Sequence, residues 1–222
     1  MSLINDNIKN ISIIVPTYNH EKYIGRCIRS LLNQSIDKNS YEIIVIDDCS
    51  TDQTKQALKV YENDINLILN KENYGLPKSL NIGIKQSKSK FIVRVDSDDY
   101  VNKDFLLMLS IFLQNNDDID AVACDYFLID EKENIVERKS TKIDPIACGI
   151  MFRYEQLIDI GLYDENFMLF EEREMRSRFD KKYSISYINL PLYRYRQHES
   201  NISKNKDSKA KYEKLLKEKI GI

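Results

Sequence analysis

Apolar residues in the first half of the chain alternate between short continuous runs and helical spacing. Four runs have the length and the β-branched composition of buried strands: 11–15, 41–46, 65–69 and 91–95. Between them, apolar residues recur every three or four positions in three segments: 21–34, the stretch from the cap-type residues 50–52 to Tyr61, and 78–87. Strands that alternate with helices in this order predict a parallel sheet that carries helices on both faces.

The second half is patterned differently. Its predicted elements are a helix at about 103–114, a strand at 121–129 with a hairpin turn at 130–134 into another strand, helices near 154–160 and 171–180, and late strands at 183–188 and 192–195. No repeat or linker divides these segments. We therefore expect one domain over 1–203, followed by an amphipathic helix at 204–222.

Composition narrows the class of protein. The 222 residues include 33 Lys and Arg and 35 Asp and Glu, and the net charge of −2 lacks the basic footprint of a nucleic-acid-binding protein. No apolar run approaches the roughly 20 residues that span a bilayer, and residues 1–10 lack the apolar core of a secretory signal. The four cysteines form no CxxC pair, which argues against disulfide or zinc frameworks and predicts a reducing, cytoplasmic location. With only His20 and His198 present, a multi-histidine metal site is excluded.

Polar clusters follow three of the predicted strands, at 16–19, 47–50 and 96–99. In a doubly wound sheet, ligands bind outside the carboxyl ends of the strands, where these clusters meet. The sequence lacks both the GxG dinucleotide loop and the GxxxxGK[ST] phosphate loop, so a phosphate ligand would have to be held by a metal ion. Asp96, Asp98 and Asp99 suit Mg²⁺ or Mn²⁺, which prefer oxygen ligands.

Each cluster also has a purely structural interpretation. A turn that leads to a helix N-cap would explain Asp96–Asp99, although a second acidic pair at an earlier strand end favours a site. Of Asp47 and Asp48, one could cap the next helix while the other binds a nucleobase. Thr17 and Tyr18 could be turn residues, or Tyr18 could pack on a base.

Four segments in this order resemble family-2 glycosyltransferases with the A-type nucleotide-sugar fold. The similar segments are IIVPTYNHEKYIGRCIRSLLNQS, YEIIVIDDCSTDQT, NKENYGLPKSLNIGIKQSKSKFIVRVDSDD and, on the acceptor side, GIMFRYEQLIDIGLYDENFMLFEERE. The late segment YRQHESNIS resembles the Arg/His segment of many members. The resemblance covers roughly 11–203, and it implies an α/β, single-domain, Rossmann-like mixed sheet flanked by helices. Residues 11–99 would form the nucleotide-sugar-binding half and 100–203 the acceptor-side half.

The resemblance also implies roles for individual residues. The expected nucleotide-sugar contacts are Pro16, Thr17, Tyr18, Asn19, Asp47, Asp48, Lys78, Asp96 and Ser97. The expected ligands of Mn²⁺ or Mg²⁺ are Asp98, Asp96, Asp99 and His198. Lys78 and Arg94 are candidate phosphate contacts; a surface position would equally explain Lys78 and is the favoured interpretation for Arg94. For His198 the alternative is a surface histidine, and the resemblance slightly favours a functional one. His20 is expected to be local and exposed.

The catalytic base is expected at Glu172, beside Glu171, where the family usually has Glu-Asp. Acids at a helix start would also explain this pair. The resemblance implies an inverting glycosyltransferase that moves a sugar from a nucleoside-diphosphate sugar, with UDP expected, to a hydroxyl of a glycan, lipid-linked or other acceptor, in cell-surface glycan or polysaccharide synthesis. The alternative is a nucleotide-sugar-binding protein with weak or lost transferase activity. A nucleotidyltransferase is disfavoured because the first strand is not followed by a glycine-rich basic loop.

The tail 204–222 holds seven Lys against three acidic residues. Such a helix predicts a solvated face, a dimer element or peripheral contact with the anionic inner face of a membrane.

Overall fold

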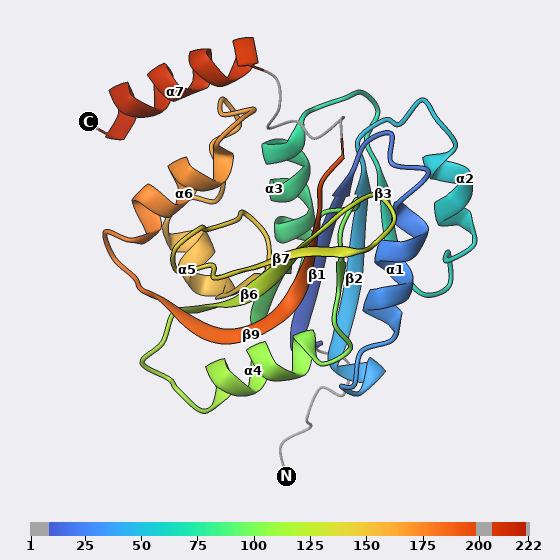
Figure 1. Cartoon of the computed structure of the whole chain (residues 1–222), viewed down its shortest axis with the longest axis horizontal. Coiled ribbons are helices and arrows are strands. Elements are labelled where there is room, and N and C mark those ends of the chain that lie inside the picture. The colour runs from blue at the N-terminus through green and yellow to red at the C-terminus, as the bar shows by residue number, and fades with distance from the viewer. Residues whose placement is uncertain (1–8, 199–205, 221–222) are drawn as a thin grey trace.

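One mixed β-sheet runs through the protein and carries helices on both faces, as the computed structural model shows (Figure 1). The structure describes residues 9–198 and 206–220. Within these residues the strands follow the order β3-β2-β1-β4-β8-β6-β9-β5, and β7 pairs with β6. The domain boundary expected between 203 and 204 lies outside the described residues, as do 199–203 of the late segment that resembles the family.

The first half builds a parallel block of four strands. These strands are β1 (Ile11–Thr17), β2 (Tyr41–Asp47), β3 (Asn66–Leu69) and β4 (Phe91–Arg94). β1 lies between β2 and β4, and Thr17 is level with Asp47 in the register. Because the strands are parallel, the polar segments that follow β1, β2 and β4 emerge at the same edge of the sheet. The predicted parallel arrangement is confirmed for this half.

Side chains alternate between two buried layers along these strands. Ile11, Ile13 and Val15 belong to one apolar cluster, and Ile14 belongs to the other. Alternation of this kind is the geometry of an extended strand buried on both faces. Helices α1 (Ile24–Leu32), α2 (Thr54–Lys59) and α4 (Phe105–Gln114) contribute to the first cluster, whereas α3 (Leu76–Gln86), α5 (Tyr154–Asp159) and α6 (Glu171–Phe179) contribute to the second. Both faces of the sheet are therefore covered, as predicted. A short 3₁₀ turn, η1 (Lys38–Ser40), precedes β2.

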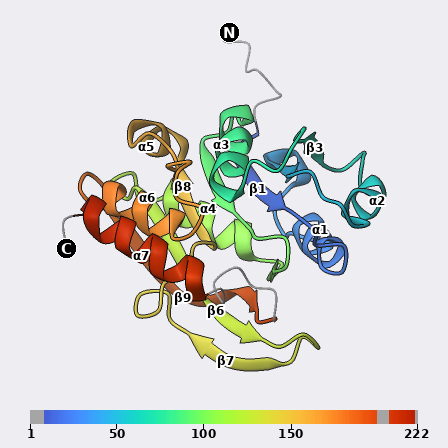
Figure 2. The same cartoon turned by 90° about the horizontal axis from the view of Figure 1, so that it is seen from above.

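The second half joins the parallel block through a strand that the sequence pattern did not reveal. β8 (Ile150–Arg153) is antiparallel to both β4 and β6 (Ala121–Ile129) and therefore connects the two halves. The predicted hairpin is confirmed, because β7 (Ile135–Lys139) returns along β6 and lies at the outer side of the molecule (Figure 2). The two-residue strand β5 (Tyr100–Val101) was also not predicted, and it pairs with β9.

The two late strands predicted at 183–188 and 192–195 are wrong as separate elements. They form one long strand, β9 (Ile185–Arg196), which runs parallel to β6. The register shifts where Ile188 pairs with Cys124 and Pro191 pairs with Asp125. Proline has no N–H to donate to a neighbouring strand, and the register shifts beside Pro191. The sequence pattern is interrupted at this point, but the strand continues through it.

Helix α7 (Lys206–Ile220) confirms the predicted C-terminal helix and packs on the second half near α6 (Figure 1). Leu216 is buried, and Lys219 forms ion pairs with Asp164 and with Glu174 of α6, the latter at 2.8 Å. One Lys of the tail is therefore engaged within the domain. No helix in the described ranges combines the length and the apolar character required to cross a bilayer.

Candidate active site

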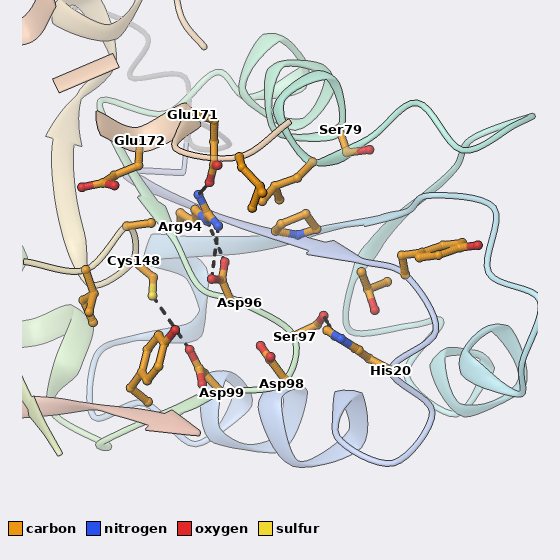
Figure 3. A pocket seen from close by; sticks show the side chains of 18 of the residues that line it. His20, Ser79, Arg94, Asp96, Ser97, Asp98, Asp99, Cys148, Glu171 and Glu172 are labelled. Atoms are coloured by element: carbon orange, nitrogen blue, oxygen red, sulfur yellow. Dashed lines mark hydrogen bonds and ion pairs between the residues drawn. The ribbon is translucent and has the colours of Figure 1, made fainter. Parts of the chain in front are cut away.

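A cavity of about 870 Å³ opens at the carboxyl ends of β1, β2 and β4. Its opposite wall comes from the second half, including the start of α6 (Figure 3). The predicted site residues that line it are Pro16, Thr17, Tyr18, Asn19, Asp48, Asp96, Ser97, Asp98, Asp99, Glu171 and Glu172. Asp47, Lys78 and His198 are outside this lining. The fold therefore brings most of the predicted donor and base residues to one cavity.

The loop after β1 is tied to the loop after β2. Asn19 adopts a left-handed backbone conformation with φ 55°, and its side-chain oxygen accepts a hydrogen bond from Thr51 N at 2.8 Å. Its backbone N–H donates to Ser50 Oγ at 3.0 Å. Asn tolerates this conformation better than most residues. Thr17, at the end of β1, is buried, and its hydroxyl has no hydrogen-bond partner among the described residues.

Asp48 rather than Asp47 faces the cavity. The Asp48 carboxylate accepts hydrogen bonds from Tyr74 N at 2.9 Å and from Gly75 N at 2.8 Å, and from the Asn70 side chain at 2.7 Å. Asp47 is buried and accepts a hydrogen bond from Ser50 N at 3.1 Å, which holds the loop after β2; it does not cap α2, the role that the sequence alternative proposed for one of the pair. The structure therefore separates two acids that the sequence could not distinguish.

At Gly75, the loop that precedes α3 packs directly against the second half of the chain. Its φ is +86°, and a Cβ built at this position would collide with Met168 Cε. Met168 lines the cavity from the opposite side, so the two halves touch directly at this point. The N–H that Gly75 donates to Asp48 depends on the same backbone conformation.

We expect Gly75→Ala to destabilise the protein by roughly 1–2 kcal/mol, the cost of a left-handed alanine, because the Met168 atoms that its Cβ meets end a flexible, exposed side chain that can move aside. Urea unfolding measures this free energy. Gly161→Ala is the matched control, since Gly161 has φ +83° but its built Cβ meets only Arg178 Nη1, at 3.9 Å. The two losses should be similar, and a much larger loss for Gly75→Ala would show that Met168 cannot move aside.

The three acids of the Asp-Ser-Asp-Asp segment have different surroundings. Asp96 is held in a fork by Arg94, with Nε at 2.6 Å and Nη2 at 3.2 Å. Asp99 is fully engaged, because Oδ1 accepts from Arg196 N at 2.7 Å and Oδ2 accepts from Tyr193 Oη at 2.8 Å. Burial, reinforced by the charges of Asp98 and Asp96, raises the pKa of Asp99 well above its usual range. Asp99 is therefore a structural acid in this arrangement.

Asp98 is paired with His198. His198 Nε2 lies 2.8 Å from Asp98 Oδ2. Burial favours the protonated acid, but the hydrogen bond with His198 and the nearby imidazoles of His20 and His198 outweigh it and lower the pKa of Asp98. Asp98 is therefore an ionised carboxylate at neutral pH.

Both histidines differ from their surface interpretations. His198 is only 3% exposed and stacks on Tyr23, with 5.0 Å between the ring centroids. His20 lines the cavity, and its Nδ1 lies 2.6 Å from Ser97 Oγ, so the expectation of a local, exposed His20 is wrong. The sequence carried no signal for this contact, because its partner follows a different strand.

Arg94 is the main correction among the basic residues. The solvated surface position favoured for it is wrong, because Arg94 is 7% exposed and lies between Asp96 and Glu171 (Figure 3). Lys78 is half-buried, and its ammonium lies 3.8 Å from the centroid of the Tyr74 ring. Arg94 lines the cavity and Lys78 does not.

Asp98 and His198 offer a carboxylate and an imidazole for a divalent cation, and here the two side chains are hydrogen-bonded to each other. Carboxylate and imidazole ligands both suit Mn²⁺. Ligand atoms of Asp96, Asp99 and Cys148 also lie within 4.8 Å of one another. In that trio Asp96 and Asp99 also accept the hydrogen bonds described above, and burial raises the pKa of the Cys148 thiol well above its usual range, which disfavours the thiolate that binds metals.

Glu171 and Glu172 have different tasks at the start of α6. Glu171 is buried and pairs with Arg94 Nη1 at 2.8 Å. Glu172 turns away from that guanidinium (Figure 3), and its nearest cation is Arg176 at 3.4 Å. Burial, with a smaller contribution from the charge of Glu171 and opposed by Arg176, raises the pKa of Glu172. Glu171 is thus held by Arg94, and Glu172 is the carboxylate of the pair whose affinity for a proton is raised.

Comparison with known families agrees with this geometry. The family described as Glycosyl transferase family 2 matches residues 12–197. The chain belongs to this family. Its sheet with flanking helices is the A-type fold that the sequence resemblance implied, and it superposes on the crystal structure of Staphylococcus aureus TarS 1–349 in complex with UDP-GlcNAc with a TM-score of 0.78. That match has 26% sequence identity and covers 93% of this chain and 65% of the TarS chain.

Two further comparisons, one of sequence and one of structure, define the extent of the similarity. The poly(ribitol-phosphate) β-N-acetylglucosaminyltransferase TarS of Staphylococcus aureus is 44% identical over 108 residues, which is 47% of this chain and 19% of TarS. The chain thus matches about a fifth of the length of that glycosyltransferase. The mannosyltransferase PcManGT from Pyrobaculum calidifontis, in complex with GDP-Man and Mn²⁺, has a TM-score of 0.76 over 96% of this chain and 64% of PcManGT. Its 17% identity shows the shared fold alone.

Proposed function

We propose that this family-2 glycosyltransferase moves a sugar from a UDP-sugar to a hydroxyl acceptor with inversion at the anomeric carbon. The observation that carries the proposal is that one cavity contains both the strand-end donor residues and a carboxylate with a raised pKa, Glu172. The two sets come from opposite halves of the chain. A transferase needs such an arrangement, because the acceptor hydroxyl must reach the bound sugar from the side opposite the diphosphate.

The donor nucleotide would lie against the loops that follow β1 and β2. The buried Thr17 hydroxyl, which lacks a partner among the described residues, is available to hydrogen-bond a nucleobase. Tyr18 is 43% exposed at the cavity and offers its ring for stacking. Asp48 shapes this wall by fixing Tyr74 and Gly75. The UDP-GlcNAc complex of TarS, which shares the fold, supports UDP as the nucleotide.

Asp98 and His198 would hold a Mn²⁺ or Mg²⁺ ion, because carboxylate and imidazole groups both suit Mn²⁺. Such an ion, when bound, neutralises the charge of the diphosphate. Arg94 and Glu171 form the wall between this end of the cavity and Glu172. Asp96, ion-paired with Arg94, would contact the ribose side of the donor.

Glu172 would act as the base. As the acceptor oxygen bonds to the anomeric carbon, the bond from that carbon to the diphosphate oxygen breaks, and the hydroxyl proton passes to Glu172. Because burial raises its pKa, Glu172 binds this proton more strongly than an exposed glutamate would. TarS is named for a poly(ribitol-phosphate) substrate, and we propose a polyol-phosphate or related cell-surface glycan as the acceptor class.

Nucleotide titration with and without Mn²⁺ tests this proposal. We expect UDP to bind at least about tenfold more tightly with Mn²⁺ than without it, and more tightly than GDP or dTDP. A coupled assay should detect UDP release from at least one UDP-sugar, with UDP-GlcNAc tested first. Absence of metal-dependent binding of all three nucleotides would contradict the proposal.

The alternative is a donor-binding protein with weak or lost transferase activity. Glu at the position where the family usually has Asp favours it, because the extra methylene of Glu172 changes the reach of the carboxylate. This alternative predicts tight UDP-sugar binding without UDP release in the same assay.

The tail 204–222 remains a candidate for peripheral membrane contact, with α7 presenting exposed Lys214 and Lys217.

A further inference from the structure

Arg94 joins carboxylates from the two halves of the chain. It stands at the end of β4, and its Nε and Nη2 atoms hold Asp96 while Nη1 lies 2.8 Å from Glu171 Oε1 (Figure 3). Arg94 and Glu171 are both almost fully buried. A guanidinium cannot lose its charge in a protein, so in a buried position it requires these anionic partners.

The contact is placed where α6 begins. Phe170, immediately before the helix, has a left-handed backbone with φ 62°, and Glu171 is the first helical residue. Glu172 follows directly and faces the cavity. The direction of the Glu172 side chain therefore depends on how the first turn of α6 is held, and Arg94 is the cation that holds it from the donor side.

The planar fork of Arg is needed for this geometry. Arg94 uses three nitrogen atoms on two carboxylates at the same time. A Lys ammonium is a compact point charge, and at this site it could not reproduce the two-point grip on Asp96 together with the contact to Glu171. Lys at this position would preserve the charge and lose the alignment.

We propose that Arg94 is a positioning residue for sugar transfer, which fixes the donor-side carboxylate Asp96 and the helix turn that presents Glu172 in one rigid unit. This inference rests on the proposed function. In this role Arg94 acts through Asp96 and Glu171, the two carboxylates that it holds. Its loss should therefore affect the transfer step more than the binding of the nucleotide.

Arg94→Lys tests the proposal in the full chain. We expect the kcat of transfer to fall by about 10- to 100-fold, since misplacement of reacting groups by about 1 Å can have effects of this size. The donor KM and the Kd for UDP with Mn²⁺ should change by less than about threefold. Arg153→Lys is the matched control, because Arg153 also makes several hydrogen bonds, to the carbonyls of Leu113, Asn116 and Ile119, but lies outside the cavity lining. It should leave kcat within about twofold of the wild type even if stability falls.

A second variant guards against misfolding of Arg94→Lys. Glu171→Gln keeps a side-chain oxygen for Arg94 and removes the charge, and we expect it to lower kcat while the Kd for UDP is unchanged. In the double variant the two effects on kcat should be less than additive, because both substitutions disturb the same unit. A kcat of Arg94→Lys close to the wild-type value, additive effects, or a parallel fall in UDP affinity would overturn the proposal. If the wild-type chain itself transfers no sugar, the proposed function fails instead, which is a separate result.

Discussion

Glu172→Gln is expected to lower the kcat of sugar transfer by about 100- to 10,000-fold, the range typical for removal of a general base. Gln cannot accept the acceptor proton, but it has nearly the same shape, so the Kd for UDP with Mn²⁺ should not change. The wild-type kcat should rise with pH as Glu172 ionises, through a pKa above the usual range of glutamate, since burial raises it. Steady-state kinetics across pH and nucleotide titration measure these effects.

The melting temperature of Glu172→Gln shows whether a lower kcat comes from loss of the base or from loss of folding. A pKa that is raised in the folded protein means that the ionised side chain is less favourable there than in the unfolded chain, so ionised Glu172 lowers stability at neutral pH. Glu172→Gln should therefore melt at or above the wild-type temperature. Glu174→Gln, on the same helix but paired with Arg178 and Lys219, should instead lower stability and leave kcat nearly unchanged. Near-normal transfer by Glu172→Gln would show that another group takes the proton.

Asp98→Asn is expected to weaken Mn²⁺-dependent UDP binding by about 100-fold or more, because it removes the ionised carboxylate of the Asp98–His198 pair. The metal-independent part of UDP binding should remain. Electron paramagnetic resonance of Mn²⁺ gives a readout that does not depend on turnover, and the bound-ion signal with UDP should be lost.

Asp144→Asn is the matched control for Asp98→Asn. Asp144 lines the same cavity, but its side chain is 59% exposed and its nearest cation, Lys139, is 4.0 Å away. This variant should change UDP affinity by less than about threefold. Equal Mn²⁺ binding by Asp98→Asn and the wild type would rule out Asp98 as the metal-holding carboxylate.

The parallel half of the fold is predictable because its signals are local. A β-branched run such as 11–15 is buried on both faces, and the polar residues that follow it must emerge at the strand end. The placement of Thr17, Asn19 and Asp98 at one cavity follows from parallel pairing alone. The resemblance of the motifs then supplied the family.

The remaining features depend on contacts between distant segments. Four residues, Ile150–Arg153, give too short a run to distinguish a central strand from the start of the helix that follows. Whether Asp47 or Asp48 faces the cavity depends on the backbone of Tyr74 and Gly75, in a different loop. The burial of Arg94 depends on Glu171, and charged residues are expected at the surface unless such a partner is known.

The position of β8 in the middle of the sheet has a consequence for how the protein is made. β4 pairs with β1 on one side, and its other side is completed by β8, which is synthesised only after β6 and β7. Until residues 150–153 arrive, the nascent parallel block presents β4 as an open edge lined by apolar side chains, the kind of edge that recruits other chains. The strand that joins the two halves of the sheet is thus also the one that ends the aggregation-prone stage of folding.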